Sequence, residues 1–116
     1  MSAIKTVWAL ERRCWLEGRS YYKEILADDA LYAFPPPMGL FRGNQFVDQM
    51  GEDGPCVSVE MTMKHDQLRD GVAVLAYHGA GTGPDGGLRM SHCTSVWREA
   101  ADGWKLACHH QTPLTE

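Results

Sequence analysis

A two-residue hydrophobic repeat in the second half of the chain restricts the possible folds most. Apolar residues at positions 57, 59, 61 and 63 alternate with polar residues at positions 58, 60, 62 and 64. This period is typical of a half-buried β-strand. Turn-rich segments then separate three more strand-like runs, at residues 72–80, 88–98 and 104–112. The sequence therefore predicts a meander of four long strands after Pro55.

The first half of the chain shows helical spacing instead. In residues 2–17, positions three or four apart form one stripe: Ile4, Val7, Trp8, Glu11, Cys14 and Trp15. We expect a second helix at residues 20–26 and a short third helix from Asn44, its N-cap, to about Met50. Phe46, Val47 and Met50 should face inward from this third helix.

Between these helices, residues 30–34 are strand-like and end at three prolines, which lack the amide donor of a ladder. Residues 38–43 are expected to form a loop. Helices and strands that are segregated along the chain indicate an α+β domain. We expect three N-terminal helices packed on a strongly curved antiparallel sheet, which forms a cone with a central pocket.

Length and composition limit the number of domains, the kinds of binding partner and the cellular location that we expect for this protein. A chain of 116 residues suits one domain, spanning residues 1–116. With 11 basic and 15 acidic residues and no dense basic cluster, we expect no nucleic-acid partner. No apolar run is long enough to cross a bilayer and no secretory leader is apparent, so we expect no membrane partner and a cytoplasmic location. The four cysteines lack C-x-x-C spacing, so we expect buried free thiols.

Four stretches resemble one superfamily. They are "LERRCW" (10–15), "LADDALYAFPPPMGLFRG" (26–43), "VAVLAYHGAGTGPDGGLRMSHCTSVW" (72–97) and "VWREAADGWKLACHHQTP" (96–113). Together they resemble the nuclear transport factor 2-like, or cystatin-like, cone fold. The family includes ketosteroid isomerase, scytalone dehydratase, SnoaL-like polyketide cyclases and the association domain of calcium/calmodulin-dependent kinase II. The chain most resembles its small stand-alone members of unassigned activity, and the resemblance implies a homodimer.

The resemblance also bears on the reaction. The isomerase has a general-base aspartate just before the proline that ends its first strand, and the matching residue here is Phe34. A phenyl ring cannot accept a proton, which argues against isomerase chemistry of that kind. The dehydratase uses histidines on central strands, and His78 and His92 are the residues that match.

The five histidines include two pairs of interest. A hairpin folded about Asp85 places His78 opposite His92, where the two rings could act as acid and base, or serve only as hydrogen-bonded parts of the sheet. His109 and His110 point to opposite faces, and the turn at residues 102–103 decides which of them faces the pocket. The sequence leaves this open, with a preference for His110. We expect no metal and no cofactor, because metal-ligand spacing and second-shell acceptors are absent.

Aromatic residues suggest what the pocket binds. We expect Tyr32, Phe34 and Met38, held by the adjacent prolines, to line its mouth with His110 and to contact a small apolar or aromatic molecule. The function favoured by the sequence is therefore a dimeric small-molecule-binding domain. Two alternatives remain: a dehydratase- or cyclase-type enzyme that uses His78 and His92, and an assembly module.

Overall fold

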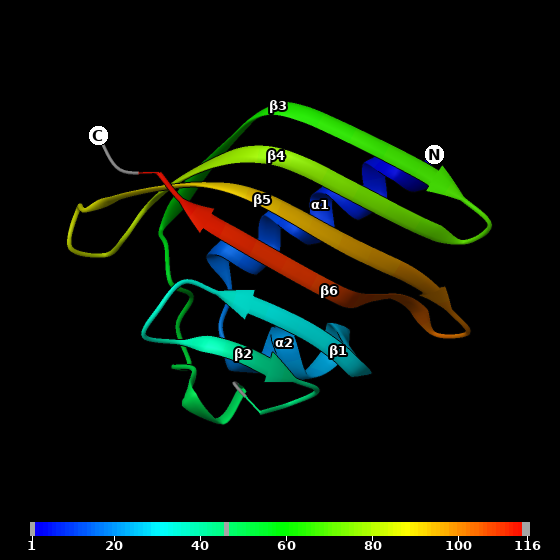
Figure 1. Cartoon of the computed structure of the whole chain (residues 1–116), viewed down its shortest axis with the longest axis horizontal. Coiled ribbons are helices and arrows are strands. Elements are labelled where there is room, and N and C mark those ends of the chain that lie inside the picture. The colour runs from blue at the N-terminus through cyan, green and yellow to red at the C-terminus, as the bar shows by residue number, and fades with distance from the viewer. Residues whose placement is uncertain (1, 46, 115–116) are drawn as a thin grey trace.

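The computed structural model describes residues 2–45 and 47–114 and has an α+β architecture (Figure 1). Its α-helices are α1 (Ala3–Leu16) and α2 (Arg19–Ile25), and a single 3-10 turn, η1, spans Val47–Gln49. The strands are β1 (Leu26–Phe34), β2 (Gly39–Arg42), β3 (Ser58–Arg69), β4 (Val72–Thr82), β5 (Leu88–Ala100) and β6 (Gly103–Pro113). No helix in the described ranges is both long enough and apolar enough to span a bilayer.

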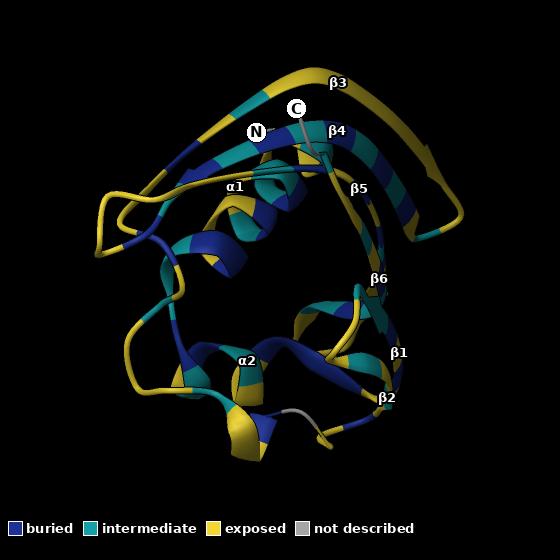
Figure 2. Cartoon of the chain, turned by 60° about the vertical axis from the view of Figure 1, so that its left-hand side comes forward, coloured by how far each residue is buried: buried dark blue, intermediate teal, exposed yellow. Residues whose placement is uncertain are grey.

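All six strands belong to one curved sheet, in the order β2-β1-β6-β5-β4-β3. The four-strand meander β3–β6 is antiparallel, as predicted. The β1–β6 pairing is parallel, however, so the sheet is mixed and not wholly antiparallel. In β3 the register shifts between Thr62 and His65, and Met63 adopts a φ of 51°. Such a bulge bends a strand, and Figure 2 shows β3 and β4 arching over α1.

The prediction of three helices is wrong by one, because residues 44–45 and 47–50 do not form an α-helix. Their bonds, Val47 N–H to Asn44 O and Met50 N–H to Val47 O, link residues three apart, which makes a 3-10 turn. A segment this short has little intrinsic helix stability, so its tertiary contacts decide its conformation. Val47 is buried, as expected, whereas Phe46 lies outside the described residues.

The loop expected at residues 38–43 is in part a strand. Gly39, at φ +84°, reverses the chain after the prolines, and Phe34 then pairs with Gly39 in an antiparallel ladder. The sequence did not reveal this strand because it has only four residues and follows a proline run. As a result, β1 and β2 form a two-stranded flap next to β6, at the open end of the cone (Figure 1).

Helix α1 fills the concave side of the sheet. Its buried residues are Val7, Glu11, Cys14 and Trp15. The indole of Trp15 lies against two glycines of β4, where an added Cβ would come within 2.4 Å of the ring at Gly79 and 2.8 Å at Gly81. Only glycine permits this close approach of helix and strand.

Candidate functional site

A cavity of about 360 Å³ opens between the concave face of the sheet, the C-terminal end of α1 and the segment that follows η1. Tyr32, Phe34 and Met38 all line it, which is where the sequence analysis placed them. Other lining residues are Cys14, Trp15, Tyr22, Met50, Cys56, Arg89, Leu106, His109 and Gln111. Whether these side chains contact a ligand stays a prediction.

One wall of the cavity is aromatic. The rings of Tyr32 and Phe34 lie nearly parallel, 12° apart with centroids 5.9 Å from one another. Phe41 meets Phe34 edge-on at 6.2 Å, and His109 lies 5.9 Å from Phe34 on the other side. Because Tyr32 and Phe34 are two residues apart on β1, both project into the same side of the sheet. The aromatic cluster on β1 and β2 therefore ends at the His109 imidazole.

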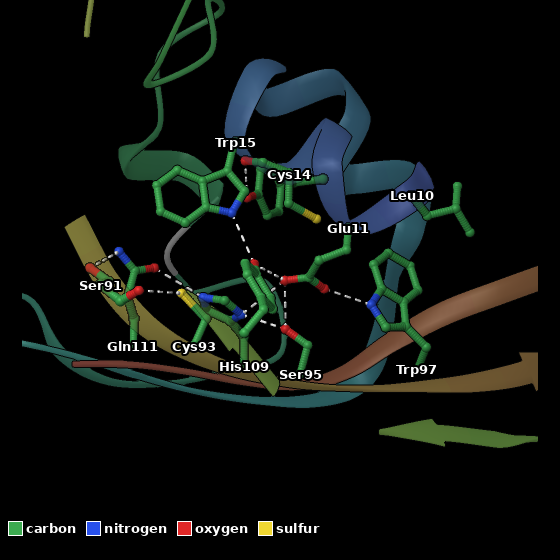
Figure 3. A network of polar contacts seen from close by, with 12 residues as sticks. Leu10, Glu11, Cys14, Trp15, Ser91, Cys93, Ser95, Trp97, His109 and Gln111 are labelled. Carbon is green, nitrogen blue, oxygen red and sulfur yellow. Dashed lines mark hydrogen bonds and ion pairs between the residues drawn. The ribbon is translucent and has the colours of Figure 1, made fainter. Parts of the chain in front are cut away.

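Beneath this wall lies a buried carboxylate that belongs to Glu11. Its side chain projects from α1 toward the sheet and is fully buried (Figure 3). One oxygen accepts hydrogen bonds from the Tyr77 hydroxyl at 2.5 Å and the Ser95 hydroxyl at 2.8 Å. The other accepts from the Trp97 indole at 2.8 Å. Three donors thus replace the water that a buried carboxylate loses.

His109 belongs to the same polar network as Glu11 (Figure 3) and also lines the cavity. Its Nδ1 lies 2.7 Å from the Ser95 hydroxyl and 3.7 Å from Glu11 Oε2, and its Nε2 lies 3.0 Å from Gln111 Oε1. The Ser95 proton is directed to Glu11, so the hydroxyl oxygen accepts from Nδ1–H. The Gln111 amide donates to Ser91 at 3.3 Å, and its oxygen faces Nε2 of His109.

Both ring nitrogens of His109 are therefore engaged, Nδ1 by Ser95 and Nε2 by Gln111. Ser95 connects the ring to the buried Glu11 carboxylate, whose Oε2 lies 3.7 Å from Nδ1. The network therefore fixes the orientation of the imidazole at the end of the aromatic wall.

The remaining acidic groups near the network stay neutral. Burial, and then the nearby Glu11 charge, hold the pKa of Tyr77 well above its usual value, so this hydroxyl remains a donor. Burial likewise raises the pKa of the Cys93 thiol to about 12. Burial also raises the pKa of Cys14. Because the thiolate is the reactive form, Cys14 and Cys93 are poor nucleophiles.

The structure places His109, and not His110, in the cavity. His109 is buried, whereas His110 is exposed on the outer face of the sheet. The reason is a bulge in β6, where Leu106 pairs with Trp97 but Cys108 pairs with Val96, so that one residue is extra. This bulge reverses the alternation, and Leu106 and His109 therefore face inward together. The preference for His110, which assumed strict alternation from Leu106, is corrected.

His78 and His92 are directly opposite each other in the β4–β5 ladder, which confirms the predicted pairing. Their rings are 5.8 Å apart and meet at 71°. They lie with His65 and His110 in a separate shallow groove of about 350 Å³ on the outer face. The structure therefore does not bring His78, His92 or His110 together with Tyr32, Phe34 and Met38.

We compared the chain with known protein families, curated proteins and solved structures. No family model matches the chain, and no curated protein matches it either. Among solved structures, it is similar to a protein from Parabacteroides distasonis named as a candidate ketosteroid isomerase, at 18% identity and a TM-score of 0.83, covering 98% of this chain and 89% of that one. It is also similar to an NTF2-like protein of unknown function in nutrient uptake from Rhodospirillum rubrum, at 17% identity and a TM-score of 0.76, covering 98% and 100%.

A third similar structure is a calcium/calmodulin-dependent kinase II hub homology domain from Chlamydomonas reinhardtii, at 19% identity and a TM-score of 0.75, covering 99% and 100%. The fold and the cavity define this chain as a helix-filled β-cone protein. Its fold is the nuclear transport factor 2-like fold, as the sequence resemblance predicts. At this level of identity the likeness establishes the fold and no particular reaction.

Proposed function

We propose that the protein binds a small, largely apolar or aromatic molecule in the cavity of the cone. The observation that carries this proposal is the parallel Tyr32–Phe34 ring pair, which lines a mainly apolar cavity of about 360 Å³. Ligand pockets in proteins commonly have volumes of about 300–1,000 Å³ with a few polar groups that fix orientation. Contact with the aromatic rings would supply affinity, and Arg89 and Gln111, which also line the cavity, would orient a polar atom of the ligand.

A comparison of two variants of the β1–β2 hairpin tests whether the ligand binds in the cavity. Met38 and Leu40 are exposed apolar residues of the same hairpin, but only Met38 lines the cavity. A panel of planar apolar molecules would be screened for thermal stabilisation, and affinities would be measured through tryptophan fluorescence. We expect binding to weaken in Met38→Ala and Phe34→Leu and to stay unchanged in Leu40→Ala. A panel without any stabilising compound, or equal losses in Met38→Ala and Leu40→Ala, would contradict the proposal.

The outer face of the sheet favours a second role, homodimerisation. Register places two uncharged rows side by side across β1, β6, β5 and β4: Leu31, Cys108, Val96 and Val74, then Ala33, His110, Thr94 and Ala76. Neither row contains Asp, Glu, Lys or Arg, although these make up 22% of the chain. Depletion of charge is the compositional mark of an interface core, so we propose that a second copy covers this face.

The similarity to an association domain from C. elegans, at 18% identity and a TM-score of 0.69, supports assembly as part of the role. A dehydratase- or cyclase-type reaction through His78 and His92 has less support. Their rings lie across the sheet from the aromatic cavity, so a substrate held there would not reach them. Isomerase chemistry is disfavoured at Phe34, which lines the cavity where that mechanism needs a base.

A further inference from the structure

In contrast to the expectation of no metal from the sequence, we propose that His78 and His92 bind one divalent transition-metal ion, of the zinc, nickel or copper class, on the outer face of the sheet. This site is distinct from the ligand cavity and does not depend on it. The two residues form a direct pair between adjacent antiparallel strands, and both strands continue in register on either side. The pair is therefore mounted on rigid backbone, which suits a metal site.

The distance between the rings fits a shared ion. Two imidazoles bound to one tetrahedral ion with metal–nitrogen distances of about 2.1 Å would place their ring centroids about 5.2 Å apart. The observed centroids are 5.8 Å apart, with the rings at 71°. Small rotations about the side-chain bonds would bring a nitrogen of each ring onto a common point, because the backbone separation is already correct.

Both imidazoles are available as ligands. In the part of the chain that the structure describes, the recorded contact of each ring is with the other ring, and neither donates or accepts a hydrogen bond. His109 provides the contrast, because both of its nitrogens are occupied within the Glu11 network. His92 is exposed and His78 is half-buried, so an ion can reach the pair from solvent.

The side chains around His78 and His92 indicate which metal ions the site would prefer. The groove contains Met63, His65, Ala76, Thr94, His110 and Thr112 beside the pair, and none of its lining residues is acidic. Imidazole donors without carboxylates suit zinc, nickel and copper, whereas magnesium and calcium require oxygen ligands. The described residues contain no ready-made group of three or more metal-binding side chains. Water therefore fills the remaining positions, or His110 does so from β6, two residues from the partner of His92.

Isothermal titration of tag-free, chelator-treated protein with zinc chloride tests the site, and cobalt(II) absorption reports the nitrogen ligands. We expect one ion per chain, and a loss of affinity of at least about tenfold in His78→Gln and in His92→Gln. His65→Gln, in the same groove, is the matched control and should change affinity by less than about twofold. All three side chains lie on the sheet surface, so circular dichroism should show unchanged folding.

Absence of zinc binding by the wild-type protein would overturn the proposal. A loss in His65→Gln equal to that in His78→Gln would also overturn the assignment to this pair. Retained affinity in both His78→Gln and His92→Gln would place the ion elsewhere. None of these results affects ligand binding in the cavity, which is measured separately with Met38→Ala.

Discussion

The buried Glu11 carboxylate should be the most sensitive polar group in the protein. In Glu11→Ala, the Tyr77 hydroxyl, the Ser95 hydroxyl and the Trp97 indole lose their shared acceptor. An unsatisfied buried donor costs about 1–3 kcal/mol. These costs do not add in full, because the hydroxyls can rotate toward other acceptors. We therefore expect a loss of about 3–6 kcal/mol.

The isosteric variant Glu11→Gln should be milder, for a reason specific to this network. The amide oxygen can accept from Trp97 while the amide nitrogen donates to the Ser95 oxygen. Ser95 can then direct its own proton to Nδ1 of a neutral His109, which lies 2.7 Å away. Most donors regain a partner, so we expect a loss of about 1–3 kcal/mol.

Urea unfolding followed by tryptophan fluorescence measures both losses, because Trp15 and Trp97 lie within the network. A loss of 1 kcal/mol corresponds to a fall in melting temperature of about 4–8 °C for a domain near this size. The expected order is wild type, then Glu11→Gln, then Glu11→Ala. If Glu11→Ala were within about 1 kcal/mol of wild type, or Glu11→Gln were the more damaging change, the buried donors would not depend on the Glu11 side chain as we infer.

Three further outcomes follow from the packing and the exposed surfaces. Gly79→Ala should destabilise the fold by about 1–3 kcal/mol in thermal unfolding, because its Cβ would meet the α1 indole at 2.4 Å, and a loss below 0.5 kcal/mol would refute this contact. At pH 8, mass spectrometry after iodoacetamide treatment of the Val96→Lys variant, in which the proposed dimer face is uncovered, should show the partly exposed Cys108 modified before Cys93, whose pKa burial raises to about 12; equal rates in folded protein would contradict this order. Val96→Lys should shift sedimentation toward monomer whereas Asp48→Lys, on η1, should not, and an unaffected Val96→Lys dimer would exclude this face.

Much of the architecture could be predicted because it depends on local periodicity. The alternation after Pro55 predicts the four-strand meander, and the symmetry of the hairpin about Asp85 predicts the His78–His92 pair. The errors occur where one or two residues decide the outcome. The extra residue in β6 moves His109 inward, and nothing in residues 103–113 marks its position. Likewise, the choice between one 3-10 turn and an α-helix at residues 44–50 depends on contacts that spacing does not reveal.

The contacts of the polar network could not be predicted from the sequence, because its residues come from separate helices and strands. Glu11 and Trp97 are 86 residues apart in the sequence. Ser95 and His109 lie on the neighbouring strands β5 and β6. One local signal was present: Glu11 falls on the otherwise apolar stripe of the first helix, where a carboxylate needs a buried partner. The identity of that partner required the register of β5 and β6.

Strand alternation separates the two surfaces on which function is proposed. Ser95 faces the inner network and its neighbour Thr94 faces the outer rows, so the same strand serves both sides. Inside, the Glu11 carboxylate already accepts hydrogen bonds from Tyr77, Ser95 and Trp97, so a ligand in the cavity need not satisfy it. Outside, the rows lack charged side chains, and a second copy or a metal ion can approach without separating an ion pair. Variants on the outer face should therefore leave cavity binding unchanged, and a loss of ligand affinity in His92→Gln would mean that the two faces are energetically coupled.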